Sequence, residues 1–368
     1  MQRCVLLTGG TGFVGSALAA SMLARGHKVV ALSRNDPGGA RTRDAVADAI
    51  SGLSIEPATG WHSRLSIANV DLSQPEMALE KLSLDEVTDT WHVAAEMSYQ
   101  PAKLPQAFHF NVASTSKLYS AIARRARNCK RFYYVSTAYT AGLDQDEVPE
   151  RLHDAPRLLN PYQVTKWSAE AVLARKSADT GLPVTIFRPS VVIGDSVTGW
   201  NGTSSFGFYM FLDGLRLAAA HGAKAVTLDL RPDAQPNIVP IDVVVKRAVA
   251  LTETTTEREQ LEVFHCVADS TIENRLVLDQ MSNATGVQVF TGPPRTPIDE
   301  LFNKHVSLNK PFADGDWRFC TKRLKQVLGK AYSPSVVSET LVATVSGSYC
   351  GARNEDVASK YQRAAKAL

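Results

Sequence analysis

A glycine-rich turn near the amino terminus constrains the fold more than any other feature of the chain. The segment "LLTGGTGFVGSAL" (residues 6–18) joins an apolar run to an amphipathic one, in which Val14, Leu18 and Met22 recur every four residues. A strand, a glycine turn and a helix in this order open a βαβ unit. Gly26 predicts the end of this first helix.

Short and nearly continuous apolar runs recur through the first half of the chain, separated by helical patterns. Such runs are typical of parallel strands that are covered by helices on both faces. The expected strands begin at Arg3, Lys28, Leu65, Thr90, Arg131 and Pro183. The alternation predicts an α/β fold with a doubly wound parallel sheet of the Rossmann type.

The alternation stops after Arg188. Residues 194–208 are rich in Gly, Ser and Thr and predict a loop, and residues 208–220 predict a helix. Residues 237–251 predict a return to the sheet, followed by a helix that Asp242 caps. Short helices and Pro-rich turns from about residue 270 predict a smaller cap, and residues 352–368 predict a solvent-exposed helix.

These patterns predict two domains. Residues 1–195 and about 226–268 are expected to form the nucleotide-binding domain, and residues 196–225 and 269–368 a substrate-binding cap.

Composition excludes several functions. A net charge of +3 over 368 residues, with no basic stripe, argues against a nucleic-acid partner. No apolar stretch approaches the length of a membrane span, and the amino terminus lacks the features of a signal peptide. The 5 cysteines are scattered without metal-ligand spacing, which predicts reduced thiols, no metal site and a cytoplasmic protein.

The glycine turn itself predicts a bound dinucleotide. "TGGTGFVG" fits the pattern TGxxGxxG, in which Gly9 allows a tight turn and Gly12 lets the backbone approach a pyrophosphate. Gly15 lets the helix pack on the strand. The amino end of the helix then faces the phosphates with its free N–H groups and its positive dipole.

The end of the second strand indicates which dinucleotide is bound. Proteins that bind NAD usually place an acidic residue there, whereas this chain has Ser33 followed by Arg34. An arginine suits the 2′-phosphate of NADP, and Arg41 and Arg43 offer a second contact. NADP(H) is therefore the predicted cofactor, with Asp36 as the alternative that would serve a ribose 2′-hydroxyl.

A second motif carries acid–base chemistry. Tyr162 and Lys166 are four residues apart at the start of a predicted helix, so they share one face. Ser136 and Thr137 follow a strand and lie at the edge where open α/β sheets bind ligands. We expect Lys166 to lower the pKa of Tyr162 and to donate to the nicotinamide ribose. Thr137 would then hydrogen-bond a carbonyl oxygen to which Tyr162 gives its proton.

Seven motifs together resemble the extended short-chain dehydrogenases/reductases. They are "TGGTGFVG", "VDLSQP", "HVAA", "NVASTSKLY", "VSTAYTAG", "YQVTK" and "RPSVVIGDSVTG", between about Arg3 and Leu251. The last motif, followed by "NIVPIDVV", is most similar to the thioester-reductase and fatty-acyl-reductase branch, of the male-sterility type.

The resemblance implies roles for further residues. Asp71 and Leu72 would contact the adenine end, Ala94 would line the groove, and Asn111 would brace the active-site helix. Residues 189–191 would meet the nicotinamide. The expected catalytic set is Thr137, Tyr162 and Lys166. The expected cofactor site is Thr8, Gly9, Thr11, Gly12, Phe13, Val14, Gly15, Arg34, Arg43, Asp71, Leu72, Ala94, Asn111, Tyr162, Lys166, Pro189, Ser190 and Val191.

The resemblance implies an NADPH-dependent oxidoreductase that reduces an acyl thioester, on CoA or a carrier protein, or the derived aldehyde. The alternatives are an NADP-dependent alcohol or ketone dehydrogenase of the hydroxysteroid type, a nucleotide-sugar epimerase or dehydratase, and a non-catalytic NADP sensor. Thr137 is followed by Ala138 and Tyr139, not by the Asp-Glu pair of the sugar dehydratases.

Four features stay open between a functional and a packing role. His92 is either a groove residue or a packed histidine. Glu96 is a weak candidate for a base, and Arg188 is expected to be buried and paired. Residues 206–212 fit either an acyl pocket or the core of the cap.

Overall fold

The computed structural model describes residues 2–143, 147–202, 204–255 and 257–352. The chain divides into two compact units. The first comprises Met1–Ser190, Val243–Val267 and Arg318–Ser333, and the second comprises Val191–Asp242, Ala268–Trp317 and the chain from Pro334 onward. These boundaries differ from the expected ones, because residues 318–333 join the first unit and residues 191–195 and 226–242 join the second.

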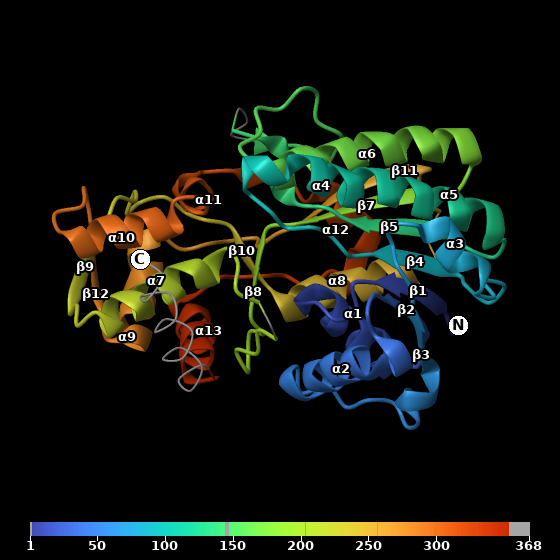
Figure 1. The fold of residues 1–368 in the computed structure, drawn as a ribbon, viewed down its shortest axis with the longest axis horizontal. Coiled ribbons are helices and arrows are strands. Elements are labelled where there is room, and N and C mark those ends of the chain that lie inside the picture. Colours follow the sequence, from blue (N-terminus) through green and yellow to red (C-terminus); the bar gives the residue numbers. More distant parts are fainter. Residues whose placement is uncertain (1, 144–146, 203, 256, 353–368) are drawn as a thin grey trace. The chain divides into compact units, whose positions relative to one another are not determined.

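A seven-stranded parallel sheet forms the centre of the first unit (Figure 1). The order β11-β7-β5-β4-β1-β2-β3 reverses direction between β1 and β4, which makes this point the switch where doubly wound sheets bind ligands. The strands are β1 (Cys4–Thr8), β2 (Lys28–Ser33), β3 (Leu65–Asn69), β4 (Asp89–His92), β5 (Arg131–Val135), β7 (Val184–Pro189) and β11 (Leu261–Cys266).

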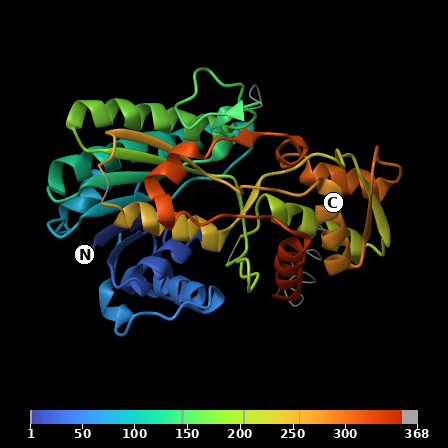
Figure 2. The ribbon, with the colours of Figure 1, turned by 180° about the vertical axis from the view of Figure 1, so that it is seen from behind.

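Helices cover both faces of this sheet, as Figure 1 shows and as Figure 2 confirms from behind, where the green α6 and the gold α8 lie on opposite sides. Because both faces are covered, β1, β5 and β7 are buried along their whole length. The helices are α1 (Phe13–Ala24), α2 (Ala40–Gly52), α3 (Pro75–Glu80), α4 (Leu104–Phe108), α5 (Thr115–Arg125), α6 (Pro161–Thr180), α8 (Ile241–Glu253) and α12 (Lys322–Leu328). A short pair, β6 (Glu147–Val148) and β13 (Arg318–Phe319), completes the unit.

Local sequence explains the length and position of α6. Its N-cap residue, Asn160, accepts a hydrogen bond from the backbone N–H of Gln163 at 2.9 Å, and Pro161 occupies the first turn. Gly181, at φ +79°, ends the helix in the left-handed conformation. The helix therefore begins one residue before Tyr162 and holds Tyr162 and Lys166 on consecutive turns.

The second unit has a core of its own. Its elements are β8 (Val191–Ile193), α7 (Phe208–Ala220), β9 (Ala225–Leu228), β10 (Ile238–Pro240), α9 (Asn274–Thr285), β12 (Gln288–Thr291), α10 (Pro297–Val306), α11 (Lys310–Asp314) and α13 (Glu339–Ala352). Phe208, Tyr209, Phe211 and Leu212 are buried in this core, whereas Phe206 is 49% exposed. Most of the aromatic run at 206–212 thus packs as core.

Three expectations for residues after 188 need comment. The predicted return to the sheet was wrong, since β10 pairs with β8 in a separate two-stranded sheet and β11 is the outer strand next to β7. The prediction that Asp242 is the N-cap residue of a helix was also wrong. Asp242 lies inside the first turn of α8 and accepts hydrogen bonds from the backbone and hydroxyl of Ser196. The helix expected over 352–368 falls, beyond Ala352, outside the described residues.

Within the described part of the chain, none of the helices combines the length and the apolar character that crossing a bilayer requires.

Candidate functional site

The predicted site residues of the first unit gather at the carboxyl ends of four neighbouring strands. Thr8 ends β1, His92 ends β4, Val135 ends β5 and Pro189 ends β7. The register aligns Thr8 with His92, and His92 with Tyr134, so the loops that follow these strands leave the sheet at one edge. The glycine turn, Ala94, Thr137 and Ser190 all lie on those loops.

The glycine turn has room only for glycine at two positions. Gly9 adopts φ +78°, and a Cβ there would lie 2.8 Å from the backbone nitrogen of Ala94. A Cβ on Gly15 would lie 2.0 Å from the carbonyl oxygen of Gly9. The first contact places Ala94 against the turn, and the second shows how closely α1 packs on β1.

The start of α1 suits an anionic ligand. Its N-cap residue is Gly12, whose lack of a side chain leaves the amino end of the helix without a side-chain cap, and no acidic residue lies in the first turn. Backbone N–H groups and the helix dipole at such an end attract phosphate. Thr11, Phe13 and Val14 are half-buried around this end, and Gly12 is exposed.

His92 supports the glycine turn through a hydrogen bond with Thr8, the residue that precedes it. The Thr8 hydroxyl oxygen accepts from the backbone N–H groups of Val93 and Ala94, both at 3.1 Å, so its own proton points to Nδ1 of His92 at 2.7 Å. Nε2 of His92 therefore carries the ring proton and donates to Thr115 at 2.8 Å. Burial lowers the pKa of His92 to about 3, which keeps the ring neutral. His92 is thus a packed, hydrogen-bonded histidine that supports the groove.

The loop after β2 places Asp36 and Arg34, the two residues predicted to contact the adenosine ribose or its phosphate, in different surroundings. Asp36 is 2% exposed, and its carboxylate accepts from the backbone of Arg41 and from both the backbone and the hydroxyl of Thr42. Arg34 is exposed, and its guanidinium lies 5.6 Å from the centre of the Phe110 ring. The side chain of Arg41 turns back onto the carbonyls of Arg34 and Asn35. The Asp36 carboxylate is therefore occupied by hydrogen bonds to Arg41 and Thr42, whereas Arg34 is exposed to solvent.

Arg43 and the residues expected at the adenine end lie around the same loop. Arg43 is exposed and donates to the carbonyl of Gly38. Asp71 is exposed, and Leu72 is half-buried. Hydrogen bonds from Ser73, and next the charge of Arg34, lower the pKa of Asp71, so Asp71 and Arg34 share one neighbourhood.

Asn111 braces the active-site helix, as the resemblance implied. It is 2% exposed, and its amide nitrogen donates to the carbonyl of Glu96 at 2.9 Å and to the hydroxyl of Thr165 at 3.0 Å. Its amide oxygen accepts from the backbone N–H of Glu96 at 2.8 Å. Asn111 therefore ties the segment after β4 to the residue that precedes Lys166. These contacts involve only the backbone of Glu96.

The three residues of the expected catalytic set lie on two adjoining elements. Nζ of Lys166 donates to the carbonyl of Val135 at 2.7 Å and lies 5.9 Å from the centre of the Tyr162 ring. Thr137 is 7% exposed two residues beyond Val135, and its hydroxyl oxygen accepts from the backbone N–H of Tyr139. Lys166 thus bridges the helix that carries Tyr162 and the strand end that carries Thr137.

The pKa of Tyr162 lies above its ordinary value, whereas the sequence predicted a lowered one, and the contribution of Lys166 to this pKa stays a prediction. Burial raises the pKa of Tyr162, and the nearby phenol of Tyr99 raises it further. Burial also lowers the pKa of Lys166 to about 7, and the charge of Glu170 opposes this shift. Desolvation disfavours the phenolate and the ammonium alike. Tyr162 is therefore a neutral phenol near pH 7.

Residues after β7 complete the predicted cofactor site. Pro189 is the last residue of β7, and Val191 begins β8 in the second unit. The hydroxyl oxygen of Ser190 is buried without a hydrogen-bond partner among the described residues. An unsatisfied buried hydroxyl is costly unless a ligand or water meets it. The uncapped helix and this hydroxyl both fit a dinucleotide, with its pyrophosphate at α1 and a polar group at Ser190.

Sequence reasoning missed two residues of the site. The Tyr99 ring lies 6.1 Å from the Tyr162 ring, and no pattern in the sequence marks it. Glu170, which is 0% exposed, pairs with Arg188. The spacing of Tyr162, Lys166 and Glu170 by four residues is the signal that could have found Glu170. The expectation of a buried, paired Arg188 is confirmed.

Comparison with known proteins identifies the family of the chain. Residues 7–248 match the NAD-binding family described as male sterility protein. The human fatty acyl-CoA reductase 1 is 27% identical over 315 residues, which cover 73% of this chain and 58% of the human protein. The chain thus spans little more than half the length of the curated relatives it matches.

Solved structures share the fold at low sequence identity. The terminal R domain of the myxalamid PKS-NRPS pathway superposes with a TM-score of 0.77 at 21% identity, covering 97% of this chain and 92% of that one. A UDP-glucuronic acid 4-epimerase from Bacillus cereus, in complex with NAD, has a TM-score of 0.66 at 17% identity and covers 95% and 97%. The fold is common to both of these proteins, whereas residues 7–248 match one family. The chain therefore belongs to the NAD-binding family described as male sterility protein.

Proposed function

We propose that this protein is an NADPH-dependent reductase that transfers hydride to the carbonyl of an acyl thioester, on CoA or a carrier protein, or to the derived aldehyde. The observation that carries the proposal is the full Thr137, Tyr162 and Lys166 set at the sheet edge of a chain related to acyl-CoA reductases. A binding protein that only senses the cofactor would have no need for a buried lysine held beside a tyrosine.

The protein's own residues supply orientation and a proton. The Thr137 hydroxyl donates to the substrate carbonyl oxygen, and the Tyr162 phenol gives its proton to that oxygen as negative charge develops there. The reduced nicotinamide supplies the hydride when it is bound. For a thioester, the resulting hemithioacetal then breaks its C–S bond and releases an aldehyde and a thiol. A neutral phenol is the form that this reductive direction requires.

The loop after β2 supports NADP(H) over NAD(H). A 2′-hydroxyl calls for a carboxylate acceptor, but the carboxylate of Asp36 is buried and holds the start of α2. A 2′-phosphate calls for a cation, and the exposed guanidinium of Arg34 lies at this strand end. Arg43 adds a second positive charge to the same loop.

Two alternatives remain as competing proposals. An NADP-dependent alcohol or ketone dehydrogenase of the hydroxysteroid type would use the same three residues in the oxidative direction. A nucleotide-sugar epimerase or dehydratase shares the fold, but a 4,6-dehydratase would need acidic residues where Ala138 and Tyr139 stand. The substrate distinguishes these functions.

Replacing Tyr162 by Phe tests the assignment. The variant keeps the ring in its buried position and removes only the hydroxyl, so we expect turnover to fall by at least about a hundredfold. The dissociation constant for NADPH should stay within about threefold of the wild type, because the ring still fills its place. Turnover close to that of the wild type would remove Tyr162 from the proton-donating role.

A further inference from the structure

A buried carboxylate lies one helical turn beyond Lys166. Glu170 is 0% exposed, and its two oxygens accept from Nε of Arg188 at 2.9 Å and from Nη2 at 2.5 Å. The same carboxylate accepts from the hydroxyl of Ser136 at 2.5 Å and from that of Thr140 at 3.4 Å. A single buried side chain therefore receives four hydrogen bonds.

These contacts join the three elements that carry the proposed catalytic and nicotinamide-binding residues. Glu170 is on α6 with Tyr162 and Lys166, and Ser136 directly precedes Thr137 at the end of β5. Arg188 is on β7, immediately before Pro189 and Ser190. A displacement of the Glu170 carboxylate would thus move the strand ends relative to the helix.

The Arg188 guanidinium is held from its other side as well. Its Nη1 donates to the carbonyl of Arg151 at 2.9 Å and to Nε2 of His153 at 2.8 Å. Burial, and then the charge of Arg188, lowers the pKa of His153 to about 3, so its ring stays neutral and accepts. The fork of Arg188 is fixed in one plane, which fixes the bidentate pair with Glu170.

A buried ion pair is a poor source of stability by itself, because desolvation offsets the attraction of its charges. A well-packed pair of apolar side chains would hold these elements together at least as well. What the pair does provide is a defined direction for each hydrogen bond. We propose that Glu170 is a positioning residue. Its hydrogen bonds with Ser136, Thr140 and Arg188 fix the geometry of Thr137, Tyr162 and Lys166. Its carboxylate supplies the negative charge that faces the Lys166 ammonium.

This inference rests on the reductase function proposed above. The groups that face Lys166 are neutral His92 from β4, Tyr134 from β5, whose ring centre lies 4.5 Å from Nζ, and Tyr162 and Glu170 from α6. Glu170 carries the only negative charge among them.

Loss of that charge has a predictable sign. The pKa of Lys166 is about 7 with Glu170 present, because burial lowers it and Glu170 raises it. Replacing Glu170 by Gln should lower this pKa by about one to three units, the usual effect of losing a nearby opposite charge. If the ammonium is the working form, the alkaline limb of the pH profile of kcat moves to lower pH by the same amount.

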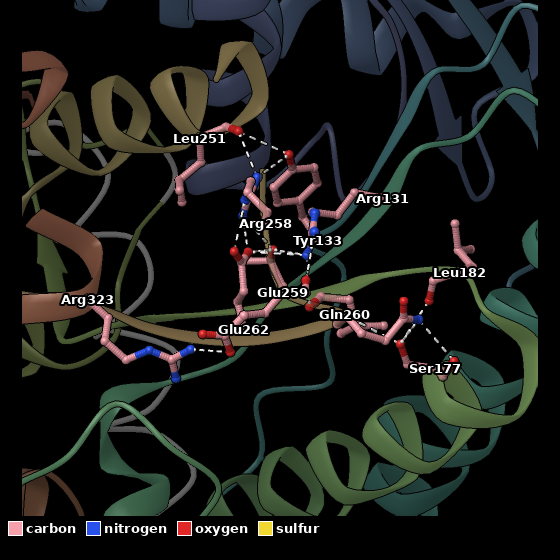
Figure 3. Close-up of polar contacts among 12 residues, drawn as sticks. Arg131, Tyr133, Ser177, Leu182, Leu251, Arg258, Glu259, Gln260, Glu262 and Arg323 are labelled. Carbon is pink, nitrogen blue, oxygen red and sulfur yellow. Dashed lines mark hydrogen bonds and ion pairs between the residues drawn. The ribbon is translucent and has the colours of Figure 1, made fainter. Parts of the chain in front are cut away.

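The matched control is at the opposite edge of the same sheet. Glu262 on β11 is 2% exposed and pairs with Arg131 and Arg258, whose guanidinium also donates to the hydroxyl of Tyr133 (Figure 3). Its replacement by Gln also breaks a buried ion pair, but at the amino ends of the strands. Glu170→Gln, Glu170→Asp and Glu262→Gln should all lower the Tm.

The experiment titrates Lys166 directly and measures kcat against pH in parallel. Protein labelled with 13C at the lysine Cε atoms reports the Lys166 pKa, and the Lys166→Met variant assigns the signal. We expect Glu170→Gln to lower the Lys166 pKa, and Glu170→Asp and Glu262→Gln to leave it within about half a unit of the wild type. An unchanged Lys166 pKa in Glu170→Gln would overturn the inference.

A second variant covers the case in which Glu170→Gln does not fold. Ser136→Ala keeps the ion pair and removes one hydrogen bond, and we expect kcat to fall about tenfold with an unchanged dissociation constant for NADPH. A kcat equal to that of the wild type would contradict the positioning role. The lysine titration needs no substrate, so it separates failure of this inference from failure of the reductase assignment, which Tyr162→Phe tests.

Discussion

Replacing Arg34 by Ala tests whether the Arg34 guanidinium makes the protein prefer NADPH to NADH. The side chain is exposed at the end of β2, where its guanidinium lies 5.6 Å from the centre of the Phe110 ring. A hydrogen bond to a charged group contributes about 1.5–3 kcal/mol, so its loss should weaken NADPH binding roughly ten- to a hundredfold. NADH has no 2′-phosphate, and its affinity should change by less than about threefold.

The assay is a fluorescence titration of wild type and variant with NADPH and with NADH at one ionic strength. Arg34→Lys retains the charge but loses the planar fork, so its NADPH affinity should fall between the two. Arg175→Ala is the control, because Arg175 is also an exposed arginine and lies near the far end of α6. Equal losses for NADPH and NADH in Arg34→Ala would refute the reasoning, since they would show that Arg34 supports the loop and not the 2′-phosphate.

Three further predictions follow from the geometry. Gly15→Ala places a Cβ 2.0 Å from the carbonyl oxygen of Gly9 and should abolish binding of NADPH in the same titration, whereas Gly347→Ala, which meets nothing within 4 Å, should not. Thr137→Val should lower kcat by about a hundredfold or more while Thr137→Ser retains most activity, and equal losses in steady-state assays would contradict a role for the hydroxyl. The buried rings of His92 and His153 have pKa values of about 3 in the folded protein, so the unfolded chain binds more protons below pH 6.5 and stability falls as the pH drops from 6.5 towards 3. At pH 5 this loss amounts to about 2 kcal/mol for each ring. Urea unfolding at pH 7 and pH 5 measures it, and a free energy of unfolding that does not fall would rule out neutral burial of these rings.

Much of the first unit could be predicted from its sequence because its signals are local. Apolar runs with helical patterns between them define the strands β1 to β5 and β7, and Asn160, Pro161 and Gly181 set the ends of α6. The glycine turn predicts a dinucleotide from the sequence, because only glycine fits at Gly9 and Gly15. These features depend on neighbours close in the chain.

The rest depends on contacts between distant segments. Strand β11 is fixed at the edge of the sheet by pairing with β7, about 75 residues earlier in the chain. The sequence pattern therefore also allowed residues 237–240 as the next strand of this sheet. Asp36 looked available for a ribose, but the chain enters α2 through Gly38 and Gly39 at positive φ, which brings backbone N–H groups onto its carboxylate. The raised pKa of Tyr162 comes from burial beside Tyr99, which no spacing reveals.

The central claim is most directly tested by the consumption of NADPH by the purified protein. A panel of acyl-CoA and carrier-linked thioesters, with the matched aldehydes and ketones, would be followed by absorbance and by product analysis, with Tyr162→Phe as the inactive control. The proposed function predicts that a thioester drives NADPH oxidation with release of an equal amount of thiol. Turnover with secondary alcohols or ketones alone would contradict it and would make the protein an alcohol dehydrogenase.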